Sequence, residues 1–518
     1  MKYNRVFTYL IMMAYFVINL LTLLDFPVVH SDEIWLKGIA DHMMTEGRFD
    51  VTEPFYDLYP RVVHPFRWLY NGILILAFSI FGNGIFTMRL LSLVCSTLML
   101  LFMVPIIHRR FGENGTAPLA LTILALNIQL VATAHTGRQE ALILLLMMAG
   151  YSLYVKQSQH LPIKLAFLLV LAFGVHPNSF LIGVAFSALL FFGILMKRNS
   201  IRQLFLFLGL TAAGLFITVM AGLSMNADFI SGYLAYGESL GVDSEPIGRF
   251  LGFYWYFVKL FHQIGGTYDL YQIKAVLVAL FLFLAFFLVY WIFHRFFKNR
   301  TDQFEIFLPA VMVLAILIGL LLIGRYNQTA VVFFVPFVLL MTLEGIHLTS
   351  KKPLVIMSLL VMLLIASGVD LQNNLSNYWQ QRFYVKSYDT VVSELQSVVP
   401  KNAIVLGNLN TLEAFDPYRF YDVRNLGYLT ENGLDFETYI RDRNIDTLVL
   451  HEEMDYLYRT SPKWDFLYVN LDYYEDMQRF IDEHCVLIKT IENPLYAMRI
   501  SKFTGTFPWQ TAIYRVLP

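Results

Sequence analysis

Long apolar stretches alternate with polar segments over the first 371 residues of the chain. The first stretch, residues 6–24, contains no charged residue and is about long enough to cross a bilayer. Further stretches follow at 88–107, 117–134, 139–155, 162–175, 179–196, 203–222, 272–293, 305–323, 329–346 and 353–371. We therefore expect a polytopic α-helical membrane protein with about eleven spans, in a membrane domain of residues 1–371.

Two long polar segments interrupt this series, at residues 25–87 and 223–271. Within the first, residues 67–81 are apolar but short, and Gly82-Asn83-Gly84 follows them, so this helix is expected to lie along the membrane interface. Within the second, the aromatic segment 250–261 suits an interfacial helix or a wall for an acyl chain.

Loop charges predict the direction of the spans. One alternate set of loops is basic and contains Lys2, Arg5, Arg109, Arg110, Lys156, Lys164, Lys197, Arg198, Arg202, Arg295, Lys298, Arg300, Lys351 and Lys352. By the positive-inside rule this set is cytoplasmic. The other set, which includes the loop after the first span, is then periplasmic. An odd number of spans places the C-terminal segment on the same side as that loop.

Residues 372–518 have a different pattern, which predicts a periplasmic soluble α/β domain. Short buried strands are expected at 403–407, 447–450 and 486–490, and helices at 387–398, 436–443 and 473–484.

The overall composition agrees with a membrane protein. The chain is 57% hydrophobic and 15% charged, whereas about a quarter of the residues are charged in ordinary soluble domains. The two cysteines, Cys95 and Cys485, fall in a predicted span and in the C-terminal domain, so we expect no disulfide between them.

Asp32 and Glu33 follow directly after the first span. Ionisable groups near lipid are costly unless they have a function, so this pair is a candidate catalytic site. The structural alternative is that Ser31 or Asp32 caps a helix over residues 34–44, and the two roles are compatible. Other polar residues of the same loop are His30, Asp41 and Asp57.

Two further groups of charged residues are predicted at the same membrane level as Asp32. Arg138 and Glu140 open the fourth span, where an interfacial arginine paired with a local carboxylate is the structural alternative. Arg325 and Tyr326 lie between two apolar spans, on the side where the positive-inside rule disfavours arginine. A bound phosphate would compensate such a charge, although the rule is only a bias.

Two histidines next to prolines, His64 and His176, are further candidates. A single histidine is more often a structural hydrogen-bonding group than a ligand. The His, Asp and Glu residues could bind a divalent cation, but no spacing among them is diagnostic, so we predict no metal site and no firm cofactor.

Several short segments, in this order, resemble the GT-C membrane glycosyltransferases, and in particular the branch of the protein O-mannosyltransferases and the lipid A aminoarabinose transferase. The resemblance covers most of residues 1–345. It depends on Asp32-Glu33, His64-Pro65, Phe81-Gly82, Met88-Arg89-Leu90-Leu91-Ser92, His108-Arg109-Arg110-Phe111-Gly112, Arg138 with Glu140, and Arg325-Tyr326 before Pro336.

The resemblance implies that a sugar moves from a polyprenyl monophosphate to an acceptor hydroxyl with inversion at the anomeric carbon. It also implies that the first aspartate of the outer loop, here Asp32, is the base. The chemistry agrees, because a single displacement needs one base, whereas glycoside hydrolysis uses two carboxyl groups. A phosphate is a weakly basic leaving group, with a second pKa of about 6, and needs cations more than a general acid.

These considerations predict a role for each candidate residue. Asp32 is the base and Glu33 orients it. Arg138, Arg325 and Tyr326 bind the donor phosphate, and Lys37 is a candidate for the phosphate-binding lysine of the first loop. Glu140, His64 and His176 support these residues.

The predicted partners are a polyprenyl-phosphate-linked sugar, a lipid, glycan or protein acceptor, and membrane lipids, with no nucleic acid. The expected location is the bacterial inner membrane with the site on the periplasmic side. One alternative is a secondary transporter or lipid flippase, although transporters usually place charges near the midplane and have repeated halves. A scaffold protein is another alternative, and it would not require Asp32.

Overall fold

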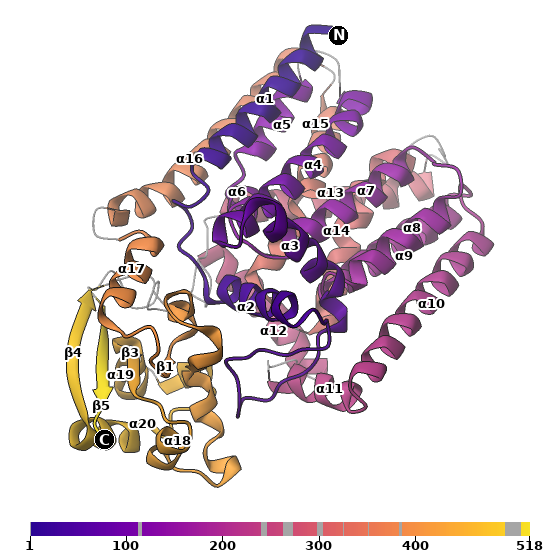
Figure 1. The fold of residues 1–518 in the computed structure, drawn as a ribbon. Coiled ribbons are helices and arrows are strands. Elements are labelled where there is room, and N and C mark those ends of the chain that lie inside the picture. The colour runs from indigo at the N-terminus through magenta and orange to yellow at the C-terminus, as the bar shows by residue number, and fades with distance from the viewer. Residues whose placement is uncertain are drawn as a thin grey trace.

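The computed structural model describes residues 2–111, 116–239, 246–262, 273–297, 304–324, 326–350, 352–382, 386–460, 462–492 and 509–518. A helical membrane domain is followed by a small α/β domain, which we call the tail domain (Figure 1). The fold class predicted from the sequence is therefore confirmed.

In the described residues the membrane domain consists mainly of helices. These helices are α1 (Lys2–Leu21), α2 (Ser31–Glu46), α3 (Trp68–Phe81), α4 (Ile85–Phe111), α5 (Thr116–Ala125), α6 (Ile128–Ala134), α7 (Glu140–Val155), α8 (Leu161–Phe173), α9 (Phe180–Leu195), α10 (Ile201–Met225), α11 (Phe229–Ser239), α12 (Pro246–His262), α13 (Lys274–Phe297), α14 (Phe304–Ile323), α15 (Val335–Thr349) and α16 (Pro353–Arg382). Short 3-10 helices precede three of them: η1 (Pro65–Arg67), η2 (Pro177–Ser179) and η3 (Gln328–Phe333).

Among the described residues, seven helical segments are long and apolar enough to cross a membrane. They are Ile85–Phe111, Pro177–Leu195, Ile201–Met225, Lys274–Phe293, Phe304–Ile323, Gln328–Thr349 and Pro353–Ser376. The pair α5 and α6 is an eighth candidate, and Val6–Leu21, Glu140–Val155 and Leu161–Phe173 are shorter apolar helices. Each predicted span thus coincides with an apolar helix or helix pair, and the protein is an integral membrane protein.

The predicted span 117–134 is broken where the sequence pattern suggests one continuous helix. α5 and α6 meet at an angle of 60°. The side-chain oxygen of Asn127 accepts hydrogen bonds from the backbone N–H groups of Gln129 (3.1 Å) and Leu130 (3.3 Å). An asparagine in this position starts a new helix, and so separates α6 from α5.

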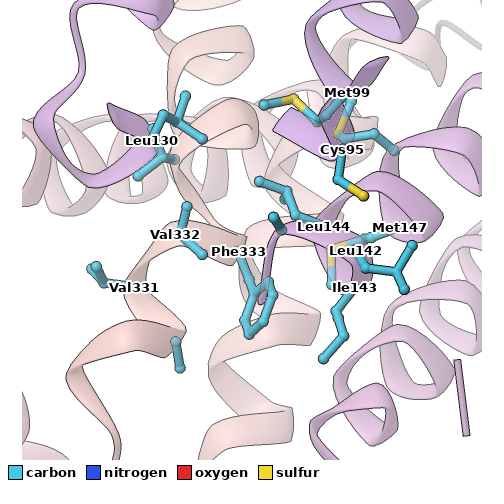
Figure 2. Packing of buried hydrophobic residues seen from close by; sticks show 14 of the residues in the cluster. Cys95, Met99, Leu130, Leu142, Ile143, Leu144, Met147, Val331, Val332 and Phe333 are labelled. Carbon is cyan, nitrogen blue, oxygen red and sulfur yellow. The ribbon is translucent and has the colours of Figure 1, made fainter. Parts of the chain in front are cut away.

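Four segments far apart in the sequence meet in the centre of the membrane domain. Figure 2 shows Met99 of α4, Leu130 of α6, Leu144 of α7 and Phe333 of η3 in this core. The window Gln328–Thr349 is 94% buried, whereas Ile201–Met225 is 17% buried, so η3 and α15 are central and α10 is peripheral. The core therefore fixes the N-terminus of α7 and the start of η3 relative to each other.

Both polar segments of the membrane domain contain helices. The first segment contains α2 and α3, and the second contains α11 and α12. α2, in the first segment, lies between the membrane helices and the tail domain (Figure 1). It ends at Gly47, whose φ of 65° lies in the left-handed region that favours glycine at the end of a helix. The aromatic segment 250–261 lies within α12 and is therefore helical, and residues 240–245 and 263–272 lie outside the described residues.

The tail domain contains a five-stranded mixed sheet with the strand order β2-β1-β3-β5-β4. The strands are β1 (Val405–Gly407), β2 (Phe420–Asp422), β3 (Thr447–His451), β4 (Cys485–Glu492) and β5 (Gln510–Val516). β1 runs parallel to β2 and β3, with Leu406 opposite Leu448, and β5 runs antiparallel to β3 and β4.

The helices of the tail domain are α17 (Tyr388–Val398), α18 (Phe436–Asp442), α19 (Glu452–Thr460) and α20 (Tyr474–His484). Three of them and three strands lie at the predicted positions. α16 continues to Arg382, beyond the boundary at 371 that the sequence suggests.

Candidate active site

The N-terminus of α2 carries the two carboxylates singled out in the sequence. The N-cap residue is His30, so the expectation that Ser31 or Asp32 caps this helix is wrong. His30 Nδ1 accepts a hydrogen bond from the backbone N–H of Asp32 (3.0 Å), and Glu33 Oε2 accepts one from the backbone N–H of His30 (2.9 Å). This capping box fixes the first turn of α2 and leaves the Asp32 carboxylate to other partners.

Glu33 is fully buried and binds Arg89 of α4. Two guanidinium nitrogens of Arg89, Nε and Nη2, donate to its two carboxylate oxygens at 2.9 Å each. Arg89 Nη1 also donates to the carbonyl oxygens of Leu23 (3.1 Å) and Pro27 (3.0 Å). A two-point arginine–carboxylate pair has a defined geometry, so it ties the exit of α1 and the start of α2 to α4.

The backbone N–H of Gly137 also donates to Glu33 Oε1, at 2.7 Å. A Cβ at position 137 would lie 2.7 Å from Met88 Cβ and 3.2 Å from Glu33 Oε1, so only glycine allows this approach. Burial alone raises the pKa of Glu33. The charge and hydrogen bonds of Arg89 and the two backbone N–H donors outweigh burial, and the pKa lies below its ordinary value.

Asp32 lies on the exposed side of the same helical turn and contacts Arg138. Arg138 Nη1 donates to Asp32 Oδ2 at 2.6 Å. The other side of the guanidinium donates to Glu140, from Nη2 at 3.0 Å and from Nε at 3.2 Å. Asp32 keeps 31% of its side-chain surface exposed, while the side chains of Arg138 and Glu140 keep 8% and 4%. The structure therefore brings together three of the residues predicted from their common membrane level.

η3 supports this group from the centre of the membrane domain. Thr329 Oγ1 donates to Glu140 Oε1 at 3.0 Å. Tyr326, three residues earlier, donates its hydroxyl to the backbone carbonyl of Arg249 in α12 at 2.5 Å, and its ring lies near Phe253 and Tyr256. Tyr326 thus connects η3 to α12. Arg325 lies outside the described residues.

Lys37 points toward the tail domain. Its Nζ lies 2.7 Å from Asp41 Oδ2 and 3.1 Å from Glu413 Oε1, and Asp41 also accepts a hydrogen bond from Asn83 (2.6 Å). Burial would lower the pKa of Lys37, but the charges of Glu413 and Asp41 raise it above its ordinary value. The ammonium group is occupied by two carboxylates, and its role at a phosphate stays a prediction.

His64 belongs to a second buried cluster, one turn along α2 from Asp32. Its Nε2 lies 3.0 Å from Glu53 Oε1, and Trp35 Nε1 donates to the same oxygen at 2.8 Å. The guanidinium of Arg67 lies over the Trp35 ring, 4.3 Å from its centroid. Burial raises the pKa of Glu53, but the His64 charge and these hydrogen bonds bring it below its ordinary value.

His176 caps the short helix η2, because its Nδ1 accepts a hydrogen bond from the N–H of Asn178 at 3.0 Å. The preceding turn contacts α3, since the N–H groups of Leu69 and Tyr70 donate to the carbonyl of Gly174. In the described part of the chain, no three His, Cys, Asp or Glu side chains are grouped so as to hold a metal ion.

The partners Arg89, Glu53, Trp35 and Thr329 were not assigned a role from the sequence, although Arg89 belongs to a segment that carries the family resemblance. Arg89 had a detectable signal, because a charged residue one turn inside an apolar span requires a buried partner. Thr329, Trp35 and Glu53 carry no such signal, since their roles arise only from packing between distant segments.

Part of the chain matches a family model, and most of it matches the fold of solved structures. Residues 64–224 match the family model described as "Dolichyl-phosphate-mannose-protein mannosyltransferase". No curated protein matches the chain.

Solved structures with a similar fold include the oligosaccharyltransferase of Archaeoglobus fulgidus. Its apo form is 11% identical, with 92% of this chain and 73% of that chain covered and a TM-score of 0.52. Its complex with Zn and sulfate is 9% identical, with coverages of 88% and 69% and a TM-score of 0.51.

A further match is ArnT from Cupriavidus metallidurans bound to undecaprenyl phosphate, at 13% identity, coverages of 86% and 96% and a TM-score of 0.39. The predicted resemblance is confirmed: the chain has the GT-C fold, and its residues 64–224 resemble the mannosyltransferase family.

Proposed function

We propose that this protein is an inverting membrane glycosyltransferase that moves a sugar from a polyprenyl-phosphate donor to an acceptor hydroxyl. We place the reaction on the periplasmic face of the bacterial inner membrane. The observation that carries the proposal is the Asp32 carboxylate, which is partly exposed at the start of α2 and lies 2.6 Å from the buried Arg138. The family match over residues 64–224 and the GT-C fold support the same class of reaction.

In the proposed reaction Asp32 takes the proton from the acceptor hydroxyl. The acceptor oxygen attacks the anomeric carbon of the sugar, and the bond from that carbon to the phosphate oxygen breaks. One displacement gives inversion, and the leaving phosphate requires cations more than a proton donor. The bidentate pair of Glu33 and Arg89 holds the turn that carries Asp32 in place.

Arg138 is the proposed phosphate ligand closest to the base. Its Nη1 faces Asp32, while Nε and Nη2 face Glu140. A donor phosphate that takes over the Nη1 contact would release Asp32 to act as a base. Arg325 and Tyr326 are proposed to assist at the same phosphate, and Lys37 and His64 to support the loop around it.

The test compares Asp32→Asn with Asp50→Asn, which removes a carboxylate from the same polar segment but from a surface pair with Arg48. Mass spectrometry of envelope lipids and glycoproteins, with and without the protein, first identifies the transferred sugar and its acceptor. We expect Asp32→Asn to abolish product formation while the lipid-linked donor is still bound, and Asp50→Asn to behave like the wild type. Wild-type transfer by purified Asp32→Asn would exclude Asp32 as the base. Donor movement across vesicles without any product would instead favour a transporter.

A further inference from the structure

Arg67 lies in the same polar segment as Asp32 and differs from the buried arginines Arg89 and Arg138. It belongs to η1, directly before α3, and only 9% of its surface is exposed. Its guanidinium lies over the Trp35 ring, at 4.3 Å from the centroid. Its Nη1 is buried and has no hydrogen-bond partner among the described residues. A buried charged donor of this kind is costly unless an acceptor binds to it.

Two connections link the segment of Arg67 to those of Asp32 and Arg138. Trp35 follows Asp32 by three residues on α2, so the two side chains are neighbours on one helix face. Tyr70 follows Arg67 by three residues, and its hydroxyl donates to the carbonyl of Gly137, the residue before Arg138, at 3.2 Å. The η1–α3 segment therefore packs against the loop that carries Arg138.

Among the buried arginines that the structure describes in this region, Arg67 is the one without a carboxylate at ion-pair distance. Arg89 is paired with Glu33, and Arg138 with both Asp32 and Glu140. Glu53 is occupied by His64 and Trp35. Within the ranges that the structure describes, no carboxylate lies within ion-pair distance of Arg67. An anion that enters between α2 and η1 would therefore meet a cation that no described carboxylate neutralises.

The surroundings of Arg67 also suit a lipid-linked anion. The neighbouring Phe66 lies 5.9 Å from Phe229 and 5.4 Å from Tyr233 of α11, measured between ring centroids. On the same helix Ile230 and Leu234 are 48% and 65% exposed. A cation next to an exposed apolar helix can bind a phosphate and an acyl chain at the same time.

We propose that Arg67 binds the phosphate of the lipid-linked donor, with Trp35 as the platform that fixes its guanidinium. This inference depends on the proposed glycosyltransferase function, because it assigns a ligand to the same site. Arg67 would hold the phosphate on the α2 side and Arg138 on the α7 side. The planar guanidinium offers two donors to phosphate oxygens, which a lysine in its place would not reproduce.

The experiment measures dissociation constants of the purified full-length protein for undecaprenyl phosphate, for undecaprenol and for inorganic phosphate. It uses wild type, Arg67→Gln, Arg67→Lys and the control Arg48→Gln, which removes an arginine of the same polar segment whose side chain is 65% exposed. We expect Arg67→Gln to weaken binding of undecaprenyl phosphate by about tenfold or more and to leave undecaprenol binding unchanged. Arg67→Lys should fall in between, and Arg48→Gln should match the wild type.

The outcomes separate this proposal from the proposed function. Unchanged affinity of folded Arg67→Gln for undecaprenyl phosphate overturns the role of Arg67 alone. Equal losses for undecaprenyl phosphate and undecaprenol also overturn it, because they indicate a structural role. A wild type that binds no polyprenyl phosphate contradicts the proposed function itself. Binding of inorganic phosphate that depends on Arg67 supports the proposal and shows that the phosphate group alone is sufficient.

Discussion

At the start of α2, the neighbouring carboxylates of Asp32 and Glu33 differ in their exposure to solvent. Glu33 is fully buried against Arg89, whereas Asp32 keeps 31% of its side chain exposed next to Arg138. A buried carboxylate that accepts four hydrogen bonds cannot easily exchange partners, so Glu33 suits a structural task. A carboxylate with an accessible edge can receive a proton from a substrate. Burial and hydrogen bonding, rather than residue type, thus distinguish Glu33 from Asp32.

The sequence predicts part of this arrangement. Asp32, Arg138 and Glu140 could be grouped because each lies at the same end of its span. The pairing of Glu33 with Arg89 could not be predicted, because the two residues are 56 positions apart and several arginines were equally possible partners. The contact between Lys37 and Glu413 could not be predicted either, because the two residues are far apart in the sequence and belong to different domains.

Glu33→Gln tests the structural role of the buried pair. Because its pKa is lowered in the folded protein, ionised Glu33 contributes stability above its ordinary value of 4.5, and this contribution is lost as the pH falls through the folded pKa. Breaking a buried ion pair by removing one partner costs about 3–5 kcal/mol. We expect Glu33→Gln to melt at a lower temperature at pH 7 and to lose less stability than the wild type below pH 4.5.

Thermal unfolding in detergent between pH 3 and pH 7, roughly the range over which carboxylates titrate, gives the answer. Glu46→Gln is the matched control, because Glu46 is an exposed residue on the same helix. A Glu33→Gln variant with the melting temperature and acid profile of the wild type would contradict the role of the pair.

At the scale of elements, α2 connects the site to the tail domain. Lys37 binds Glu413, and the loop before η1 is held by η6 (Val423–Tyr428). The Asn425 side-chain oxygen accepts hydrogen bonds from the N–H groups of Asp57 (3.1 Å), Leu58 (3.2 Å) and Tyr59 (3.0 Å), and its amide donates to the carbonyl of Phe55 (3.1 Å). The tail domain therefore orders the loop that also contains Glu53 of the Trp35 cluster.

The elements themselves were largely predictable. Apolar periodicity located the spans and three strands of the tail domain, because burial leaves a direct mark on the sequence. β2 was missed, because its three residues are not part of a longer apolar run such as 403–407, which contains β1. β5 was missed as well, because its sequence mixes polar and apolar residues and has no uninterrupted aliphatic run as long as the one in β3. The break between α5 and α6 depends on one capping side chain.

Asn425→Ala tests whether the tail domain orders this loop. The substitution removes the hydrogen-bond partner of the Asp57 and Tyr59 N–H groups. The N–H of Leu58 still has Asp57 Oδ1 at 3.0 Å, and the carbonyl of Phe55 still has the N–H of Asp422 at 3.0 Å. Each unsatisfied buried group costs about 1–3 kcal/mol. We expect faster hydrogen exchange at residues 55–59 and a lower melting temperature, together with reduced transfer activity. The control is Asn432→Ala, because Asn432 is exposed and contacts only the carbonyl of Tyr428 among the described residues. Equal exchange in both variants would show that the loop is ordered without Asn425.

At the scale of the whole molecule, the contacts of the tail domain constrain topology. Asp57 of the first polar segment accepts hydrogen bonds from Tyr439 (2.9 Å) and from Arg443 (2.6 Å) of the tail domain. These contacts cannot form across a membrane, so the tail domain and the Asp32 segment lie on the same side. The sequence suggested this arrangement independently, through the odd number of spans. The remaining question is which side of the membrane they share.

The positive-inside rule predicts which side of the membrane the tail domain and the Asp32 segment share. The Asp32 side should be periplasmic, because the alternate loops contain the lysine and arginine residues. Two single-cysteine variants test it in spheroplasts: Glu46→Cys, at the exposed end of α2, and Gln159→Cys, in the exposed turn between α7 and α8. A membrane-impermeant maleimide should label Glu46→Cys in intact spheroplasts and Gln159→Cys only after permeabilisation. The natural Cys95 is buried and Cys485 is partly exposed, so both variants carry Cys485→Ser.

The reverse labelling pattern would place Asp32 in the cytoplasm. The acceptor would then have to be a cytoplasmic molecule, and the periplasmic part of the proposed function would fail while its chemistry could stand.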